Sequence, residues 1–200
     1  MKKKILILAL LFIIIIIFGG YYLILNSSNN HTFSLDTVAL TVDDIDGNYI
    51  LEDEIHWTEP GNFTNSTGDG SKWNYTEHYQ SSFHQNTTTN ASSANEPANM
   101  IIQSITRLES KEKAALYVDL WTNGRQKKEG YLKIPIKTIG DKSGYFSYTI
   151  TYEDYKIYNY ILVFSIDDIS VTVGGGGPTV TQSMYLDLAK IIESKILNSK

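Results

Sequence analysis

The sequence predicts an α+β domain that follows a single N-terminal transmembrane helix. Three observations lead to this fold class: a long apolar run near the N-terminus, several stretches with the apolar pattern of strands, and two amphipathic helical patterns among them. The order of these patterns is β-β, insertion, β-α-β-β-β-β-α. Such an order indicates an antiparallel sheet of about five to six strands with two packed helices.

The apolar run from Ile5 to Leu25 contains no charged residue and follows three lysines at positions 2–4. As a helix it would be about 31 Å long, which matches a hydrocarbon core of about 30 Å. A cleaved signal peptide is the alternative, but its apolar region is typically only about 7–15 residues long. Basic residues beside a first span stay in the cytoplasm, which orients the rest of the chain outwards. We therefore expect a cytoplasmic stub at 1–4, a signal anchor at 5–25, a short linker at 26–31 and an extracytoplasmic domain at 32–200 of a cell-membrane protein.

The composition limits the partners of the outside domain. Of the 17 Lys and Arg residues three precede the apolar run, so the remainder carries 14 basic and 22 acidic residues, a net charge of −8. Nucleic-acid binding requires a basic surface, and we expect no nucleic-acid partner. The chain has no cysteine, so we expect a hydrophobic core, without disulfides, to hold the outside domain together.

The first half of the outside domain predicts two strands and an insertion. The β-rich residues 32–42 form the first strand, and an Asp-rich turn follows. In the second strand, residues 48–57, a period of two places Trp57 on the apolar face and His56 on the wet face. Residues 61–97 are rich in Asn, Ser, Thr and Gly without an apolar period, which predicts a flexible insertion whose few aromatic residues allow a short strand or turn.

The second half gives stronger signals. Residues 100–108 predict a strand, and a helix follows with Ser110 as its N-cap, Gly124 at its end and an apolar face that includes Val118 and Trp121. Further strands are expected at 131–136, where Pro135 indicates an edge, and at 145–152, 155–166 and 169–173, before a last helix that continues to Leu197.

Short motifs in this second half resemble a known architecture. They are Lys113-Ala114-Ala115, Ile139-Gly140-Asp141-Lys142-Ser143, Ile169-Ser170-Val171-Thr172-Val173 and Leu188-Ala189-Lys190-Ile191-Ile192. They resemble the membrane-anchored or lipid-anchored extracytoplasmic domains of bacteria and archaea, many of them uncharacterised, that have a Mog1/PsbP-like α-β-α sandwich. The resemblance covers residues 99–197. It implies a prokaryotic source and this sandwich architecture, and it carries over no catalytic residue.

Motifs for catalysis, metals and nucleotides are incomplete, so we predict no catalytic, metal-binding or cofactor-binding residue and no cofactor. The stretch Val42–Gly47 approaches a calcium loop but lacks an oxygen ligand at its first position, which favours a plain turn. His78 and His84, with His56 as a third, lack the spacing of a known metal site, which favours solvated histidines. Gly174–Gly177 lacks the Lys-Ser/Thr of a phosphate loop, which favours a flexible connector.

Two sets of residues remain as candidate sites. Tyrosines crowd one hairpin, and their rings suit stacking on sugars or a protein interface, although a half-buried sheet also favours tyrosine. Asn-x-Ser/Thr patterns, which mark candidate N-glycan acceptors, all lie before Pro97. The tyrosines are Tyr145, Tyr148, Tyr152, Tyr155, Tyr158 and Tyr160, and the asparagines are Asn26, Asn30, Asn62, Asn65, Asn74, Asn86 and Asn90.

We therefore expect a single-pass cell-surface protein whose outside domain binds or scaffolds, with the membrane and envelope glycans or other membrane proteins as partners. Two alternatives stay open: an envelope hydrolase with a carboxylate and histidine site, and a structural spacer with the Asn-rich tract as a stalk. A hydrolase predicts that His56 and the carboxylates of residues 52–54 meet residues 145–173 in one closed pocket. A binding domain predicts an intact aromatic face without a deep polar cleft.

Overall fold

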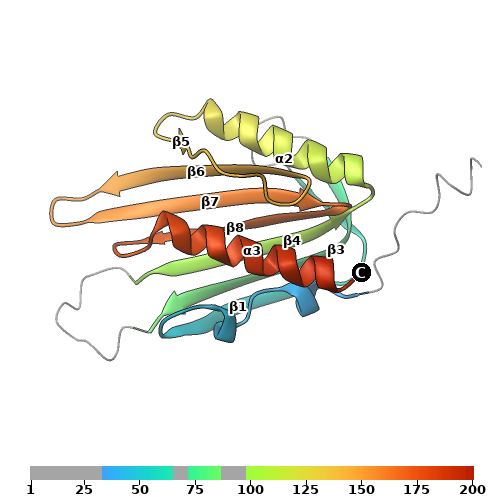
Figure 1. The fold of residues 1–200 in the computed structure, drawn as a ribbon, viewed down its shortest axis with the longest axis horizontal. Coiled ribbons are helices and arrows are strands. Elements are labelled where there is room, and N and C mark those ends of the chain that lie inside the picture. Colours follow the sequence, from blue (N-terminus) through green and yellow to red (C-terminus); the bar gives the residue numbers. More distant parts are fainter. Residues whose placement is uncertain (1–32, 65–71, 87–97) are drawn as a thin grey trace, which may run out of the picture. The chain divides into compact units, whose positions relative to one another are not determined.

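A computed structural model of the chain describes residues 33–64, 72–86 and 98–200 (Figure 1). These residues belong to one compact unit, Phe33–Lys200. The predicted stub, signal anchor and linker lie outside the described residues. Within the described ranges, no helix combines the length and the apolar character that crossing a membrane requires.

The unit is built on one antiparallel sheet. Its main path runs β1-β3-β4-β8-β7-β6-β5, and β2 pairs with β3 beside this path. The fold class is α+β, as predicted, but the sheet has 8 strands instead of five to six. The elements are η1 (Leu35–Val38), η2 (Val42–Asp44), β1 (Tyr49–Trp57), β2 (Gly61–Thr64), β3 (Lys72–Gln85), β4 (Met100–Leu108), α2 (Lys111–Gln126), β5 (Leu132–Lys133), β6 (Lys142–Thr151), β7 (Lys156–Ile166), β8 (Ile169–Gly177) and α3 (Gln182–Asn198).

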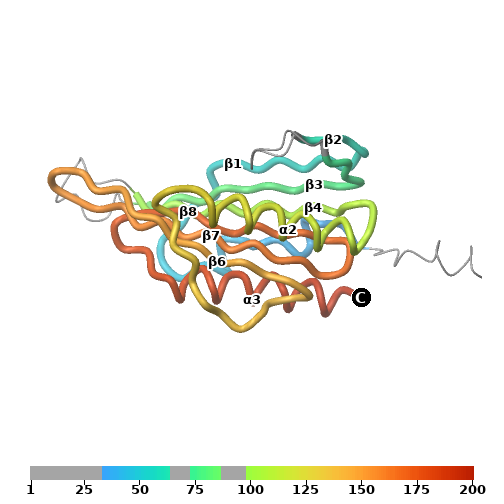
Figure 2. Tube along the Cα trace, turned by 90° about the horizontal axis from the view of Figure 1, so that it is seen from above, coloured from blue at the N-terminus to red at the C-terminus, as the bar shows by residue number. Residues whose placement is uncertain are grey.

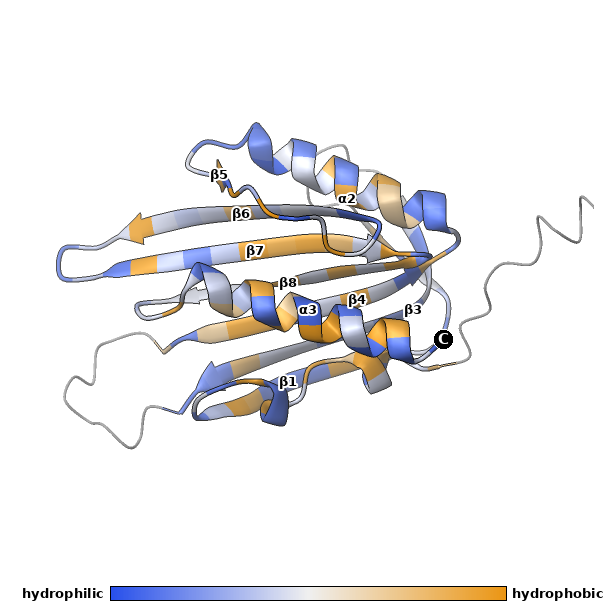
Figure 3. Cartoon of the chain, in the orientation of Figure 1, coloured by the Kyte–Doolittle hydropathy of each residue, from blue (hydrophilic) through white to orange (hydrophobic). Residues whose placement is uncertain are grey.

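The helices α2 and α3 cover opposite faces of the sheet (Figure 2). Side chains alternate along β7, so that Val163 packs with Val118 and Trp121 of α2, whereas Leu162 and Phe164 join the larger core that contains α3. The strand β7 is therefore covered on both sides, which explains the continuous apolar run of its sequence. Figure 3 shows the apolar residues concentrated along this strand and on α3.

The first helix begins after Ser110, as predicted, and the N-cap residues of both helices make their capping hydrogen bonds. Ser110 Oγ accepts a hydrogen bond from Lys113 N, and Thr181 Oγ1 accepts one from Met184 N, each at 3.3 Å. The predicted end of the first helix is wrong, since α2 continues through Gly124 to Gln126. The predicted apolar stripe of α3 is buried throughout: Tyr185, Leu188, Ala189, Ile192 and Ile196.

Residues 33–48 do not form the predicted first strand. They contain the two short 3₁₀ helices η1 and η2, and they insert Leu35 and Val38 into the core. Leu40 N donates to Gln103 Oε1 at 2.8 Å, and the Gln103 amide donates back to Leu40 O at 3.0 Å. A buried glutamine of β4 thus satisfies backbone groups that a neighbouring strand would otherwise pair.

The predicted faces of β1 are wrong after Leu51, because the strand contains a β-bulge there. The register with β3 shifts between Leu51 and Asp53, so the alternation changes phase there. His56 consequently lies opposite Tyr79 on the inner face, and Trp57 points outwards with 47% of its surface exposed. A sequence period of two cannot show where an extra residue is inserted.

The predicted flexible insertion contains two strands, β2 and β3. The 14-residue strand β3 pairs with β1 on one side and with β4 on the other, and it brings Tyr79 and Phe83 into the core. These aromatic residues supply the buried apolar area that the surrounding Asn, Ser and Thr residues lack. The remaining parts of the predicted insertion, residues 65–71 and 87–97, lie outside the described residues.

The four glycines at 174–177 are a strand and not the predicted connector. They form the end of β8, between β4 and β7, where Gly175 pairs with Ile101 and Tyr160. The neighbouring strands come so close that a Cβ atom at Gly174 would lie 2.7 Å from Tyr160 O. Glycine is therefore required here by close packing.

Candidate ligand groove

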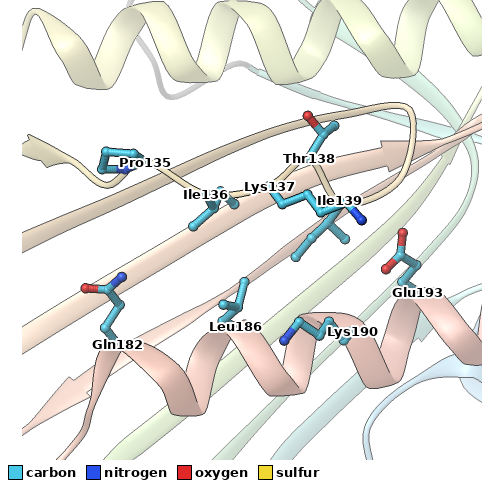
Figure 4. Close-up of a pocket in the computed structure, with 9 residues that line it drawn as sticks. All are labelled: Pro135, Ile136, Lys137, Thr138, Ile139, Gln182, Leu186, Lys190 and Glu193. Carbon is cyan, nitrogen blue, oxygen red and sulfur yellow. The ribbon is translucent and has the colours of Figure 1, made fainter.

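A groove lies between α3 and the segment that connects β5 to β6 (Figure 4). Its volume of about 540 Å³ is in the range of small-molecule sites. In Figure 4, Ile136 and Ile139 point from the connecting segment towards α3, and Leu186 points from α3 towards them. The residues that line the groove are Pro135, Ile136, Lys137, Thr138, Ile139, Gln182, Leu186, Lys190 and Glu193.

Pro135 explains why the chain leaves the sheet at this place. Leu132 and Lys133 pair with β6, and Ile134 N still donates to Tyr145 O at 2.8 Å. The next residue is proline, which has no N–H group and cannot continue the ladder. The sequence predicted this edge position but expected a longer strand, up to residue 136, and it gave no sign of a groove.

Hydrogen bonds hold the two walls of the groove. Gly140 N donates to Glu193 Oε1 of α3 at 2.7 Å, and Tyr145 OH donates to the backbone oxygen of Gln182 at 2.5 Å. Gly140 has φ 61°, and a Cβ atom there would lie 2.2 Å from Ser165 O. The segment is therefore fixed to the sheet as well as to α3.

The polar groups of the groove lie around an apolar floor. Lys190 Nζ is 3.1 Å from Asp187 Oδ1, and both side chains are more than half exposed. Lys137 is exposed, and none of the ion pairs within the described ranges includes it. The carboxylate of Glu193 is already bound by Gly140 N. The lining thus offers ammonium groups, a hydroxyl and an amide, but no imidazole that could act as a general base.

The structure separates the six predicted tyrosines. Tyr145 is completely buried, and Tyr160 packs against the same core, 6.2 Å from the Tyr145 ring. Burial raises the pKa of the Tyr145 hydroxyl well above its usual value. Tyr148 lies on the opposite face, with its ring 4.7 Å from that of Tyr131. A role in ligand binding is thus a proposal for the exposed tyrosines near the turn between β6 and β7.

At this turn the other three tyrosines are accessible. Tyr152 and Tyr155 stack with their ring centroids 4.7 Å apart, and Tyr152 N donates to Tyr155 O at 2.9 Å. Tyr152 and Tyr158 expose 46% and 39% of their surfaces. The stacked pair is therefore a pre-ordered aromatic surface at the end of the hairpin.

His56, which the sequence led us to expect as a solvated side chain, takes part instead in a polar network around Glu77. His56 Nε2 lies 2.8 Å from Glu77 Oε1, and Arg107 Nη1 donates to Glu77 Oε2 at 2.7 Å. Ser34 Oγ and Leu35 N also donate to Glu77 Oε1, at 3.0 and 2.8 Å. Glu77 is only 7% exposed. The network attaches the segment that contains Phe33, Ser34 and Leu35 to the sheet.

The predicted carboxylates do not converge with His56 on residues 145–173. Glu54 Oε1 accepts from Tyr79 OH at 2.7 Å, and burial together with this bond raises the pKa of Tyr79 to about 12. Glu52 lies 3.8 Å from His84 at the surface. Within the part of the chain that the structure describes, no three His, Cys, Asp or Glu residues are grouped as a metal site.

The calcium-like stretch is held by hydrogen bonds to Asp44. Asp44 binds Thr41 N and Lys195 Nζ, at 2.8 and 2.6 Å, which agrees with a plain turn. Burial opposes ionisation of Asp44, but these hydrogen bonds hold its pKa below the usual value.

Asn62 and Asn74 are exposed and directly opposite each other on β2 and β3. Their glycosylation, and that of Asn86, stays a prediction, and the other four asparagines lie outside the described residues.

Comparisons with known proteins identify the fold and no family. No family model and no curated protein matches the chain. Among solved structures, the chain is similar to the extracellular domain of PknH from Mycobacterium tuberculosis, with a TM-score of 0.57 and 12% sequence identity over 82% of this chain and 94% of that chain. At this identity the similarity shows the fold alone, and the Mog1/PsbP-like resemblance stays a prediction. The chain thus has an α+β fold that an extracellular domain also adopts.

Proposed function

We propose that this chain is a single-pass membrane protein whose extracytoplasmic domain binds a small ligand without catalysis. The observation that carries the proposal is the groove, which combines an apolar floor with polar groups at its rim. The charge-free run at residues 5–25 supplies the anchor. The fold shared with an extracellular domain supports the outside location.

A hydrolase is supported less well. Two of the groups that the sequence offered for catalysis make structural contacts: His56 bonds Glu77, and Glu54 accepts a hydrogen bond from Tyr79 OH. The groove contains one carboxylate, that of Glu193, and this group accepts a backbone hydrogen bond. General acid–base catalysis requires a base within reach of a bound substrate, and no second carboxylate or histidine lines the groove.

Phe33 and the stacked tyrosine pair lie at opposite ends of the sheet. Arg107 connects Phe33 O, at 2.9 Å, with Asp168 in the turn between β7 and β8, so Phe33, the first residue of the described unit, lies at that end of the sheet. The strand β7 has 11 residues and is roughly 35 Å long, which places the Tyr152 and Tyr155 pair at the opposite end. This aromatic surface suits envelope glycans or another membrane protein as a partner.

Protease treatment of intact cells that express the full chain with a C-terminal epitope tests the location. We expect the epitope signal to disappear while a cytoplasmic marker protein survives, because residues after the anchor lie outside. An epitope that survives on intact cells but is lost after lysis would contradict the outside location. The same treatment of lysed cells is the control for protease access.

Fragment binding to the full chain in lipid nanodiscs tests the groove. Methyl NMR signals of Ile136, Ile139 and Leu186 are the reporters, because these side chains form its floor. We expect a subset of a mixed library of neutral and charged fragments to shift these methyl signals and to leave that of Leu132, an exposed residue outside the groove, unchanged. A library without any fragment that shifts the floor signals would refute the groove as a binding site.

A further inference from the structure

We propose that the groove selects small monoanionic amphiphiles, molecules with a carboxylate-type head and a short apolar body. This inference rests on the proposed function, because it names the ligand class of the same groove. Its starting point is charge: the chain after residue 25 has a net charge of −8, yet two lysines and a single glutamate line the groove. A basic groove in an acidic domain is complementary to an anion.

The apolar floor of the groove determines that the ligand has an apolar body. Pro135, Ile136, Ile139 and Leu186 present apolar side chains from both walls. Burying an apolar chain against them is favourable because it removes apolar surface from water. At roughly 30 Å³ for a water-sized group, the volume of about 540 Å³ admits a ligand of up to roughly 18 non-hydrogen atoms.

The charged residues at the rim of the groove determine which head group the ligand has. Lys137 makes no ion pair with the described residues, and Lys190 shares its charge with the exposed Asp187. Glu193 is oriented towards Gly140 N, and this donor partly compensates its negative charge. The lining itself carries a formal charge of +1, from two lysines and one glutamate, and the neighbouring Asp187 reduces it. The groove therefore attracts a monoanion mainly through Lys137.

Two other parts of the molecule give weaker grounds for a ligand. The aromatic pair at the end of the β6–β7 hairpin is exposed, but nothing in the structure specifies what covers it. The Glu77 carboxylate is buried and already takes part in four hydrogen bonds. The groove, in contrast to these two parts, combines a volume, an apolar floor and a charge that distinguishes ligands.

Titrations with octanoate and the isosteric neutral octanamide test the inference. The full chain in nanodiscs is used, with the methyl signals of Ile136, Ile139 and Leu186 as readout. The free ligand concentration is measured by dialysis to correct for uptake by the lipid. We expect octanoate to bind about fivefold to tenfold more tightly than octanamide, as two exposed ion pairs allow, and this advantage to shrink at high salt.

Variants assign the effect to the two lysines. In the double variant Lys137→Gln/Lys190→Gln, octanoate affinity should fall to that of octanamide, while octanamide affinity stays unchanged. Both side chains are exposed, so the variant keeps the fold, which unchanged methyl signals of the core confirm. Lys133→Gln is the matched control, since it removes an exposed lysine of β5 that does not line the groove. It should leave both affinities unchanged.

Several outcomes would overturn the inference. They are equal affinities for octanoate and octanamide, an octanoate affinity that survives the double variant, and an equal loss in Lys133→Gln. If octanoate fails while neutral fragments shift the floor signals, the ligand class is wrong and the groove stands as a binding site. If no fragment of any charge shifts them, the proposed function fails as well.

Discussion

Replacing Gly175 by alanine should destabilise the domain by about 3–5 kcal/mol. Gly175 lies inside β8 with φ 145°, a backbone conformation that favours glycine. A Cβ atom there would lie 2.1 Å from Met100 O and 2.9 Å from Tyr185 OH. Tyr185 OH donates to Met100 O at 2.8 Å, so the substitution also disturbs the bond between α3 and β4. Both effects reduce the free energy of unfolding.

Urea unfolding of the full chain in nanodiscs, followed by tryptophan fluorescence, measures this effect. The three tryptophans, Trp57, Trp73 and Trp121, all lie within the domain, so the signal reports its unfolding alone. Gly130→Ala is the control, because Gly130 also has a positive φ, 83°, but its Cβ would meet no atom within 4 Å. It should cost about 1 kcal/mol. A loss in Gly175→Ala no larger than in this control would show that β8 is a flexible connector after all.

Replacing Glu77 by alanine should destabilise the domain by about 3–5 kcal/mol, because it leaves the partly buried Arg107 without its carboxylate. The same change removes the acceptor of Ser34 Oγ, Leu35 N and His56 Nε2. We therefore expect the segment 33–48 to detach from the sheet more often than in the unchanged protein.

Two measurements separate these consequences. Urea unfolding gives the loss of global stability, and hydrogen exchange at Leu35 N reports detachment of the N-terminal segment. Glu129→Ala is the matched control, since Glu129 is exposed in a turn and should change stability by no more than about 0.5 kcal/mol. If Leu35 N in Glu77→Ala exchanges no faster than in this control, the network does not hold the segment.

The fold class and most elements of the second half follow from local signals. The apolar stripe of α3 and its Thr181 cap are both legible within one stretch of chain, and so is the continuous apolar run of β7. The candidate groove was not predictable in this way. The groove forms because Pro135 ends a strand pairing and because Gly140 N donates a hydrogen bond to Glu193, a residue 53 positions away in the chain.

The sequence by itself determined the α+β class, the two helices and the acidic character of the domain. It did so because periodicity, capping and charge depend on residues that are close together in the chain. Only the tertiary structure decided that Gln103 would replace a strand partner for residues 33–48, and that a bulge would turn His56 inwards. It also decided that Gly174–Gly177 would be a packed strand. These outcomes depend on contacts between distant segments, which no local pattern records.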